Sequence, residues 1–406
     1  MKRLSRDIWV SVCYNETRKK KEGSGDMQNM QDMKRKRTAV VAGHICLDIT
    51  PVFHNSAKEI NQILMPGKIV NVDAAEIHSG GAVANTGLAM QFFDIDTKLM
   101  GKIGTDTMGQ TLLSCLARYG GSDGMQIDTN VTTSYSVVLA IPGIDRVFLH
   151  HSGANDTFGI KDIDFSIVEK SDLFHFGYPS IMRQLYLHDG KELKEIFQKI
   201  YHMGVITSLD MAAIDATSEA AKQDWKKILA NVLPYVDFFV PSIEEICFMI
   251  DPKRYENWVE RAGNQEITAI LDVEKDISPI AQMLQEMGAN HILLKCGAPG
   301  LYYHIGNPKQ IQRLEQKLEQ PMSDWIGQKG FQKSYSPKRV LSATGAGDTT
   351  IAAFLSAMLQ GYDFKWCIRL AAATGAVCVE QYDALGGLCP LPVLKQEIEN
   401  GWENRK

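Results

Sequence analysis

Short runs of β-branched and other apolar residues alternate along the chain with longer stretches of helical composition. The short runs predict strands at residues 38–43, 173–177, 205–210, 236–240 and 291–295. The longer stretches predict helices near residues 184–203, 217–231, 243–250 and 276–288. Strands that alternate with helices are typical of a parallel, doubly wound sheet, so we expect an α/β protein.

A second set of strands is predicted from a different pattern, in which apolar and polar residues alternate. This pattern occurs at residues 68–72, 75–78, 133–141 and 146–150. Pro142-Gly143-Ile144-Asp145 has the composition of a turn between the last two. We expect these strands to form a small sheet with two different faces, separate from the parallel sheet.

The stretch from residue 341 to residue 359 joins a turn of small residues to an apolar helix. Gly345 and Gly347 permit backbone conformations and close approaches that larger residues forbid. The first N–H groups of the helix lie at the positive end of its dipole, which favours an anion such as a phosphoryl group. Asp348 fits this setting either as a base for an attacking hydroxyl or as the residue that caps the helix.

Composition narrows the class of protein. Of the 406 residues, 45% are hydrophobic and 22% are charged, as in soluble globular proteins. The formal net charge of −5 gives no sign of nucleic-acid binding, and no apolar run approaches the roughly 20 residues that span a bilayer. Eight cysteines without a Cys-x-x-Cys pair argue against zinc and disulfides and favour free thiols in a reducing cytoplasm.

Residues 1–37 differ from the rest of the chain. Basic residues cluster at Arg18-Lys19-Lys20-Lys21 and again at Lys34-Arg35-Lys36-Arg37. We expect a disordered extension or an upstream start codon here, and a targeting or interaction arm is the alternative. The folded domain is expected to occupy residues 38–400.

Two motifs resemble the signatures of the PfkB (ribokinase-like) carbohydrate kinase family. One is Gly345-Ala346-Gly347-Asp348, and the other is GGAVANTGLA at residues 80–89 followed by GKIGTDTMG at residues 101–109. The resemblance covers about residues 38–399. It implies a three-layer α/β/α sandwich with a mostly parallel, doubly wound sheet, and a small β-sheet lid. The lid strands, at about residues 49–79 and 132–151, would cover a sugar and exclude water.

The resemblance also implies an activity, which is ATP-dependent phosphorylation of a primary hydroxyl of a small sugar or sugar derivative. Asp348 would act as the base, and the backbone N–H groups of Ala346, Gly347 and Asp348 would stabilise the developing charge. Gly345, Ala346 and Gly347 complete the implied catalytic motif. Asp48 lies just past the first predicted strand, where open α/β sheets bind ligands. The family places its sugar at positions that here are Asp48, Gly80, Gly81, Asn85 and Asn155.

The nucleotide would lie near a second group of residues. The sequence from Lys295 to Gly300 resembles the family's nucleotide turn, and a later helix would pack near the adenine. The implied ATP contacts are Lys295, Gly297, Gly300, Ala372 and Gly375. Glu245 would place Mg²⁺ through water, and a solvated helix face is its alternative. Ser242 stands where the family has Asn.

One position departs from the family pattern. Ser342-Ala343 replaces an Asp-Thr pair whose Asp resembles a potassium ligand, so we expect weak attraction for a monovalent cation. A nucleoside kinase and a sugar- or nucleotide-binding regulator without activity are the alternative functions. Exposed lid strands would allow a homodimer. A dehydrogenase is disfavoured because no Gly-x-Gly-x-x-Gly fingerprint follows the first strand.

Overall fold

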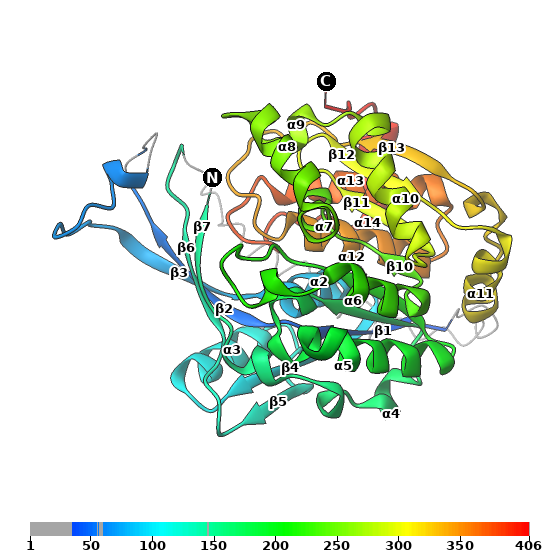
Figure 1. Cartoon of the computed structure of the whole chain (residues 1–406), viewed down its shortest axis with the longest axis horizontal. Helices are drawn as coiled ribbons and strands as arrows, with labels where there is room; N and C mark the ends of the chain where they lie inside the picture. Colours follow the sequence, from blue (N-terminus) through cyan, green and yellow to red (C-terminus); the bar gives the residue numbers. More distant parts are fainter. Residues whose placement is uncertain (1–34, 55, 57–59, 144–145, 406) are drawn as a thin grey trace, which may run out of the picture. The chain divides into compact units, whose positions relative to one another are not determined.

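A nine-stranded sheet, sheet A, organises the computed structural model, which describes residues 35–54, 56, 60–143 and 146–405 (Figure 1). Its strand order is β13-β12-β11-β10-β9-β8-β1-β4-β5, and all neighbours from β11 to β5 pair in parallel. β12 and β13 pair antiparallel at one edge. The strands are β1 (Thr38–Gly43), β4 (Asp96–Gly104), β5 (Met125–Asp128), β8 (Leu173–Gly177), β9 (Ile206–Asp210), β10 (Phe238–Phe239), β11 (His291–Lys295), β12 (Gly300–His304) and β13 (Lys329–Lys333).

Helices cover both faces of sheet A, because the side chains of its central strand alternate between two apolar cores. Ala39 and Val41 belong to one core, whereas Val40 and Ala42 belong to the other. The first core is completed by α2 (Gly81–Phe92), α3 (Thr107–Ala117), α11 (Pro308–Leu318), α12 (Ala346–Leu359), α13 (Phe364–Cys378) and α14 (Leu391–Glu399). The second is completed by α4 (Phe165–Val168), α5 (Arg183–His202), α6 (Trp225–Val232), α7 (Ile243–Ile250), α8 (Pro252–Ala262) and α10 (Ser278–Glu286). The predicted three-layer arrangement is therefore confirmed.

Short helical segments complete the connections. They are α9 (Ile267–Ile270), η1 (Ile60–Gln62), η2 (Gly153–Thr157), η3 (Ile160–Asp162), η4 (Pro179–Ile181), η5 (Ala220–Lys222), η6 (Leu233–Tyr235), η7 (Val273–Ile277) and η8 (Ser323–Trp325). Two predicted helices differ in detail. α5 is interrupted at residues 187–190, where three residues adopt left-handed backbone angles. α6 begins only at residue 225, because the side chain of Asp224 caps it by accepting a hydrogen bond from Lys227 N.

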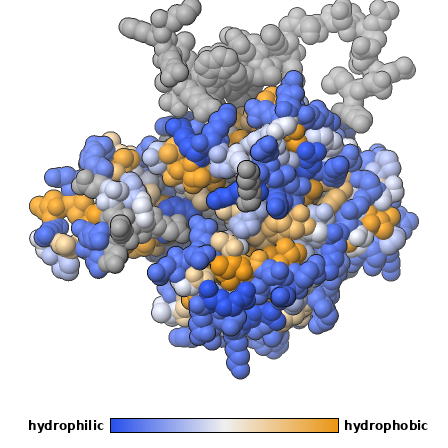
Figure 2. All heavy atoms as spheres, turned by 90° about the horizontal axis from the view of Figure 1, so that it is seen from above, coloured by the Kyte–Doolittle hydropathy of each residue, from blue (hydrophilic) through white to orange (hydrophobic). Residues whose placement is uncertain are grey.

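The small sheet, which we call the lid, has the order β3-β2-β6-β7. Its strands are β2 (Cys46–Val52), β3 (Asp73–Gly80), β6 (Tyr135–Leu139) and β7 (Val147–His151). The strand predicted at residues 68–72 is wrong, since this segment has no strand pairing and Ile69 is 93% exposed. Several apolar side chains of the lid face solvent, as Figure 2 shows at the left.

The crossing from sheet A to the lid is very short. β1 ends at Gly43 and β2 begins at Cys46, so the chain leaves one sheet and enters the other within two residues. Asp48 lies past the end of β1, as the sequence suggested, and it is inside β2. The strand at residues 46–52 was not predicted, because it contains Pro51, a residue that usually argues against a strand.

Two predictions fall partly outside the described residues. Of the expected N-terminal extension, only residues 35–37 are described, and Ile144 and Asp145 of the expected lid turn are also outside the described part. Within the described ranges, we find no helix with the length and apolar character needed to cross a membrane.

Candidate active site

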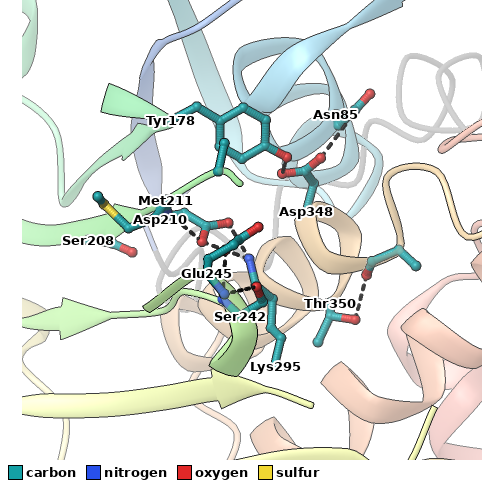
Figure 3. Close-up of polar contacts among 12 residues, drawn as sticks. Asn85, Tyr178, Ser208, Asp210, Met211, Ser242, Glu245, Lys295, Asp348 and Thr350 are labelled. Carbon is teal, nitrogen blue, oxygen red and sulfur yellow. Dashed lines mark hydrogen bonds and ion pairs between the residues drawn. The ribbon is translucent and has the colours of Figure 1, made fainter. Parts of the chain in front are cut away.

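The buried carboxylate of Asp348 is the centre of the candidate site (Figure 3). Asp348 lies in the first turn of α12 and is 3% exposed. Asn85 Nδ2 of α2 donates to Asp348 Oδ2 at 2.9 Å, and the Tyr178 hydroxyl donates to Oδ1 at 2.7 Å. Residues far apart in the sequence thus hold both oxygens of one carboxylate.

Asp348 does not cap α12. The capping position is Gly345, whose φ of 71° lies in the left-handed region that glycine tolerates, and no side chain bonds the first amides. The capping alternative for Asp348 is therefore wrong. Ala346 N bonds Ala343 O at 3.3 Å, which leaves the N–H groups of Gly347 and Asp348 as the first-turn donors without a partner inside the helix.

Burial controls the charge of Asp348. It raises the pKa of this carboxyl, whereas the nearby Lys295 ammonium and the hydrogen bonds from Tyr178 and Asn85 lower it. Because the charged form keeps two donors and a nearby cation, Asp348 can be ionised in spite of its burial. A base with a raised pKa next to helix N–H groups is suited to proton transfer.

Lys295 and Asp210 form a buried ion pair beside this centre. Lys295 lies at the end of β11 and its Nζ contacts the carboxylate oxygens of Asp210, at the end of β9, at 2.7 Å and 2.6 Å. A Cβ placed on Gly347 would lie 3.5 Å from Lys295 Nζ, so the ammonium is adjacent to the first turn of α12. Burial raises the pKa of Asp210, and the attraction of Lys295 opposes that rise.

Glu245 is bound to the start of α7. Ser242 N donates to Glu245 Oε2 at 2.9 Å, and Glu245 N donates to Ser242 Oγ at 3.4 Å, which together form a capping box. The solvated-face alternative does not describe this arrangement, since Figure 3 shows Glu245 beside Asp210 and Lys295. Across the described ranges, no three His, Cys, Asp or Glu side chains group as direct metal ligands.

A cleft next to Asn85, the hydrogen-bond partner of Asp348, lies between the lid and the loop before α12. Its lining includes Asp48 and Val138 from the lid, Asn85 from α2, Thr344 and Ala384. The sequence-predicted residues Asp48 and Asn85 therefore meet in one cleft. Ser342 also lines the cleft, and it stands where the family pattern has Asp.

Two glycines allow this close approach of the lid to α2. A Cβ on Gly80 would lie 2.0 Å from Asp48 Oδ2, so any larger residue would displace the carboxylate. Gly81 has a φ of +83°, and its Cβ would lie 2.6 Å from His44 Nδ1. Gly80 is therefore required by the position of Asp48, and Gly81 is required by its backbone angle and by the close approach of His44.

The remaining sequence candidates have structural explanations of their own. Asn155 is fully buried, and its amide bonds Ile45 N at 3.2 Å and Ile45 O at 2.9 Å, so it secures the crossing between the sheets instead of lining the cleft. A Cβ on Gly375 would lie 2.5 Å from Thr350 Oγ1, which reflects close packing of α13 on α12. Ala372 is likewise buried in α13.

The two nucleotide-turn glycines lie where the backbone demands them. Gly297 has a φ of +57° and Gly300 a φ of +142°, both unfavourable for other residues. A Cβ on Gly300 would lie 2.1 Å from Gln332 O of β13. The turn between β11 and β12 thus needs glycine with or without a nucleotide, and nucleotide contact stays a prediction.

Sequence reasoning missed Tyr178 and Asp210. Asp210 ends a predicted parallel strand, and the rule that drew attention to Asp48 would have found it. Tyr178 follows β8 with a φ of 69°, an unusual backbone angle for tyrosine that the sequence does not reveal. Its role depends on a hydrogen bond to a residue 170 positions away.

Comparison with known proteins places the chain among sugar kinases. A model of the pfkB family carbohydrate kinases matches residues 38–388. A sugar kinase of Archaeoglobus fulgidus that is described as uncharacterized is 25% identical over 294 residues, which cover 72% of this chain and 95% of that protein. Ribokinase of Arabidopsis thaliana is 22% identical over 336 residues, which cover 80% and 74% of the two chains.

Solved structures share the fold. The structure of Arabidopsis thaliana ribokinase complexed with ribose and ATP has a TM-score of 0.63 at 19% identity, covering 89% of this chain and 98% of that one. Fructokinase with bound ATP from Xylella fastidiosa has a TM-score of 0.62 at 16% identity, covering 90% and 99%. The predicted ribokinase-like fold is confirmed.

The half-buried position of Asp48 at the cleft has a measurable cost in stability. Burial raises the pKa of Asp48 from its ordinary 3.8 to about 6, so folding binds a proton between these values and stability falls as pH rises through them. We expect Asp48→Asn to stabilise the protein by about 1–2 kcal/mol at neutral pH. The gain should vanish in acid below pH 3.8. Thermal unfolding across this pH range measures it.

Asp106→Asn is the matched control. Asp106 accepts hydrogen bonds from Gly109 N and Thr133 N, each at 2.8 Å, and caps α3. The same change should therefore destabilise the protein at neutral pH. Equal loss of stability in both variants would contradict the conclusion that the charge of Asp48 destabilises the protein at neutral pH.

Proposed function

Since this chain belongs to the pfkB family of carbohydrate kinases, we propose that it transfers phosphate from ATP to a primary hydroxyl of a small sugar or sugar derivative. The observation that supports this most strongly is the placement of Asp348. Its carboxylate lies in the first turn of α12 and accepts a hydrogen bond from Asn85, which lines the cleft together with Asp48. We call the N–H groups of Gly347 and Asp348, at the start of α12, the anion seat. A base that is close to both the anion seat and a polar cleft suits direct transfer of a phosphoryl group to a hydroxyl.

Asp348 removes the proton in the proposed reaction. Asn85 and Tyr178 each donate to one oxygen, and a carboxylate has further lone pairs for a substrate hydroxyl. These two donors fix the direction of the carboxylate and keep it ionised. The hydroxyl that gives up its proton then attacks phosphorus in line.

The acceptor is held from the lid and from α2. Asp48 accepts hydrogen bonds from sugar hydroxyls, and Asn85 has an amide that can also contact the sugar. Gly80 and Gly81 let the lid strand and the helix approach each other closely around the sugar. The lid excludes water, which would otherwise compete as an acceptor.

The phosphate groups are held at the sheet edge. The N–H groups of Gly347 and Asp348, with Lys295 Nζ beside Gly347, form a positive seat that fits a transferring phosphoryl group. Glu245 has a carboxylate that fits a metal bound through water, because Mg²⁺ commonly takes few protein ligands and several waters. Bound Mg²⁺ neutralises charge on the triphosphate. Gly297, Gly300, Ala372 and Gly375 would border the nucleotide.

The cytoplasm is the proposed location. The described cysteines are free, including Cys46, whose thiol lies 3.2 Å from Asp48 Oδ1. Free thiols are compatible with a reducing compartment.

The kinase activity is tested by ADP release from Mg-ATP with a panel of ribose, fructose, 2-keto-3-deoxygluconate, inositol and nucleosides. We expect one strong sugar acceptor, and Asp348→Asn should lower kcat by about 10²–10⁴-fold while ligand binding persists. The physical reason is that the amide cannot accept the proton. Asp123→Asn, an exposed carboxylate next to Ser122, is the control and should keep normal turnover.

Three outcomes would revise the proposal. A nucleoside as the preferred acceptor would make the protein a nucleoside kinase of the same fold. Ligand binding without turnover would favour a regulator. Normal turnover by Asp348→Asn would remove Asp348 from the role of base.

Tyr178 is proposed to lower the pKa of the base, Asp348. Its hydrogen bond lowers the pKa of Asp348, so Tyr178→Phe should raise that pKa and move the acidic limb of the kcat/KM profile upward by roughly one pH unit. Tyr302→Phe is the control, because the buried Tyr302 hydroxyl has no partner in the described part of the chain. Coincident pH profiles for the Tyr178 variant and the wild type would contradict this role.

The lid is proposed to mediate a homodimer. β3 and β7 are its edge strands, and Ile77, Phe148 and Leu149 expose apolar side chains on them. We expect light scattering to give the mass of two chains, and Phe148→Lys to reduce it to one. Val259→Lys, on exposed α8, should leave the mass of the wild type. A wild-type mass of one chain contradicts the dimer.

A further inference from the structure

An arginine of the lid contacts the loop that precedes α12. Arg146 lies directly before β7, and its Nη1 donates to Thr344 Oγ1 at 2.7 Å. The same hydroxyl oxygen lies 2.9 Å from Ser342 Oγ, which in turn accepts from Thr344 N at 3.1 Å. A guanidinium from the lid therefore completes a small hydrogen-bonded turn next to the anion seat.

This loop has no negative charge of its own. Residues 341–347 contain no acidic side chain, and Ser342 stands where an Asp was expected from the family pattern. Thr344 also lines the cleft with Asp48 and Asn85. The positive charge of Arg146 is thus placed at the boundary between the cleft and the anion seat.

Two carbonyl oxygens near this loop, those of Thr344 and Ala384, contact the thiol of Cys378. Cys378 Sγ lies 3.7 Å from Thr344 O and 3.5 Å from Ala384 O. Burial raises the pKa of Cys378 to about 11, so the thiol keeps its proton at neutral pH and serves as a donor. A free cation would have to displace this thiol and approach a guanidinium that repels it.

We propose that Arg146 is a positioning residue that supplies the fixed positive charge at this loop when the lid covers the cleft, so that transfer needs no monovalent cation. The proposal rests on the proposed kinase function. Charge that is already in place beside the first N–H groups of α12 stabilises the phosphoryl group in the transition state without reorganisation. Because Arg146 belongs to the lid, the position of the lid that covers the cleft and excludes water also places the guanidinium at this loop.

Arg146→Met tests the proposal. We expect kcat to fall roughly tenfold or more with a smaller change in the KM for the acceptor, because the charge acts on the transferring group. Millimolar guanidinium chloride should partly restore kcat in this variant, a response that a merely structural role would not produce. Wild-type kcat should be the same in potassium chloride and in sodium chloride.

Matched variants separate charge from packing. Arg146→Lys keeps a positive charge and should retain more activity than Arg146→Met. Thr344→Val removes the hydroxyl acceptor, and combined with Arg146→Met it should cost less than the sum of the two single changes. Arg183→Met, which removes an exposed arginine paired with Glu219, should neither lower kcat nor respond to guanidinium.

The results that overturn the proposal differ from those that overturn the kinase function. Normal kcat in Arg146→Met, or a wild-type requirement for potassium, contradicts the role of Arg146 alone. Absence of turnover with every acceptor contradicts the kinase function. In that case the melting temperatures of the wild type and of Arg146→Met, measured with each cation, test the role of Arg146. Specific stabilisation of the wild type by potassium over sodium opposes the proposal. Stabilisation of Arg146→Met, and not of the wild type, by millimolar guanidinium supports it.

Discussion

The site depends on keeping one carboxylate ionised where water does not reach it. A buried charge is stable only when donors and opposite charge replace its hydration. Asn85 and Tyr178 supply the donors to Asp348, and Lys295 supplies the opposite charge. These residues come from α2, from the end of β8 and from the end of β11, so three elements of the fold must be in place before the carboxylate has these partners.

The doubly wound sheet makes this convergence possible. Parallel strands end at the same edge, so β8, β9 and β11 bring Tyr178, Asp210 and Lys295 together although long helices separate them in sequence. α12 begins at the same edge and adds its first N–H groups. The two apolar cores on either side of the sheet carry the stability that such buried charges reduce.

The lid adds a second level of organisation. It follows β1 after only two residues, and Gly80 and Gly81 allow it to approach α2 and His44 closely. Asp48 is thereby fixed opposite Asn85, and Arg146 reaches the loop before α12. The cleft and the contact with the loop before α12 therefore both depend on one position of the lid.

The sequence by itself determined the class of fold and the chemical centre. Short, mostly apolar runs that alternate with helical stretches favour strands buried on both faces, so four strands of sheet A were placed almost to the residue. The motif ending in Asp348 identified the start of α12. Short or exposed segments such as residues 46–52 and 68–72 were misjudged, because pairing with neighbouring strands decides their structure. The tertiary structure alone decided that Asp348 bonds Tyr178 instead of capping its helix, that Lys295 pairs with Asp210, and that Asn155 is structural. These contacts span 170, 85 and 110 positions, and local sequence carries no record of which distant side chain will fill a given site.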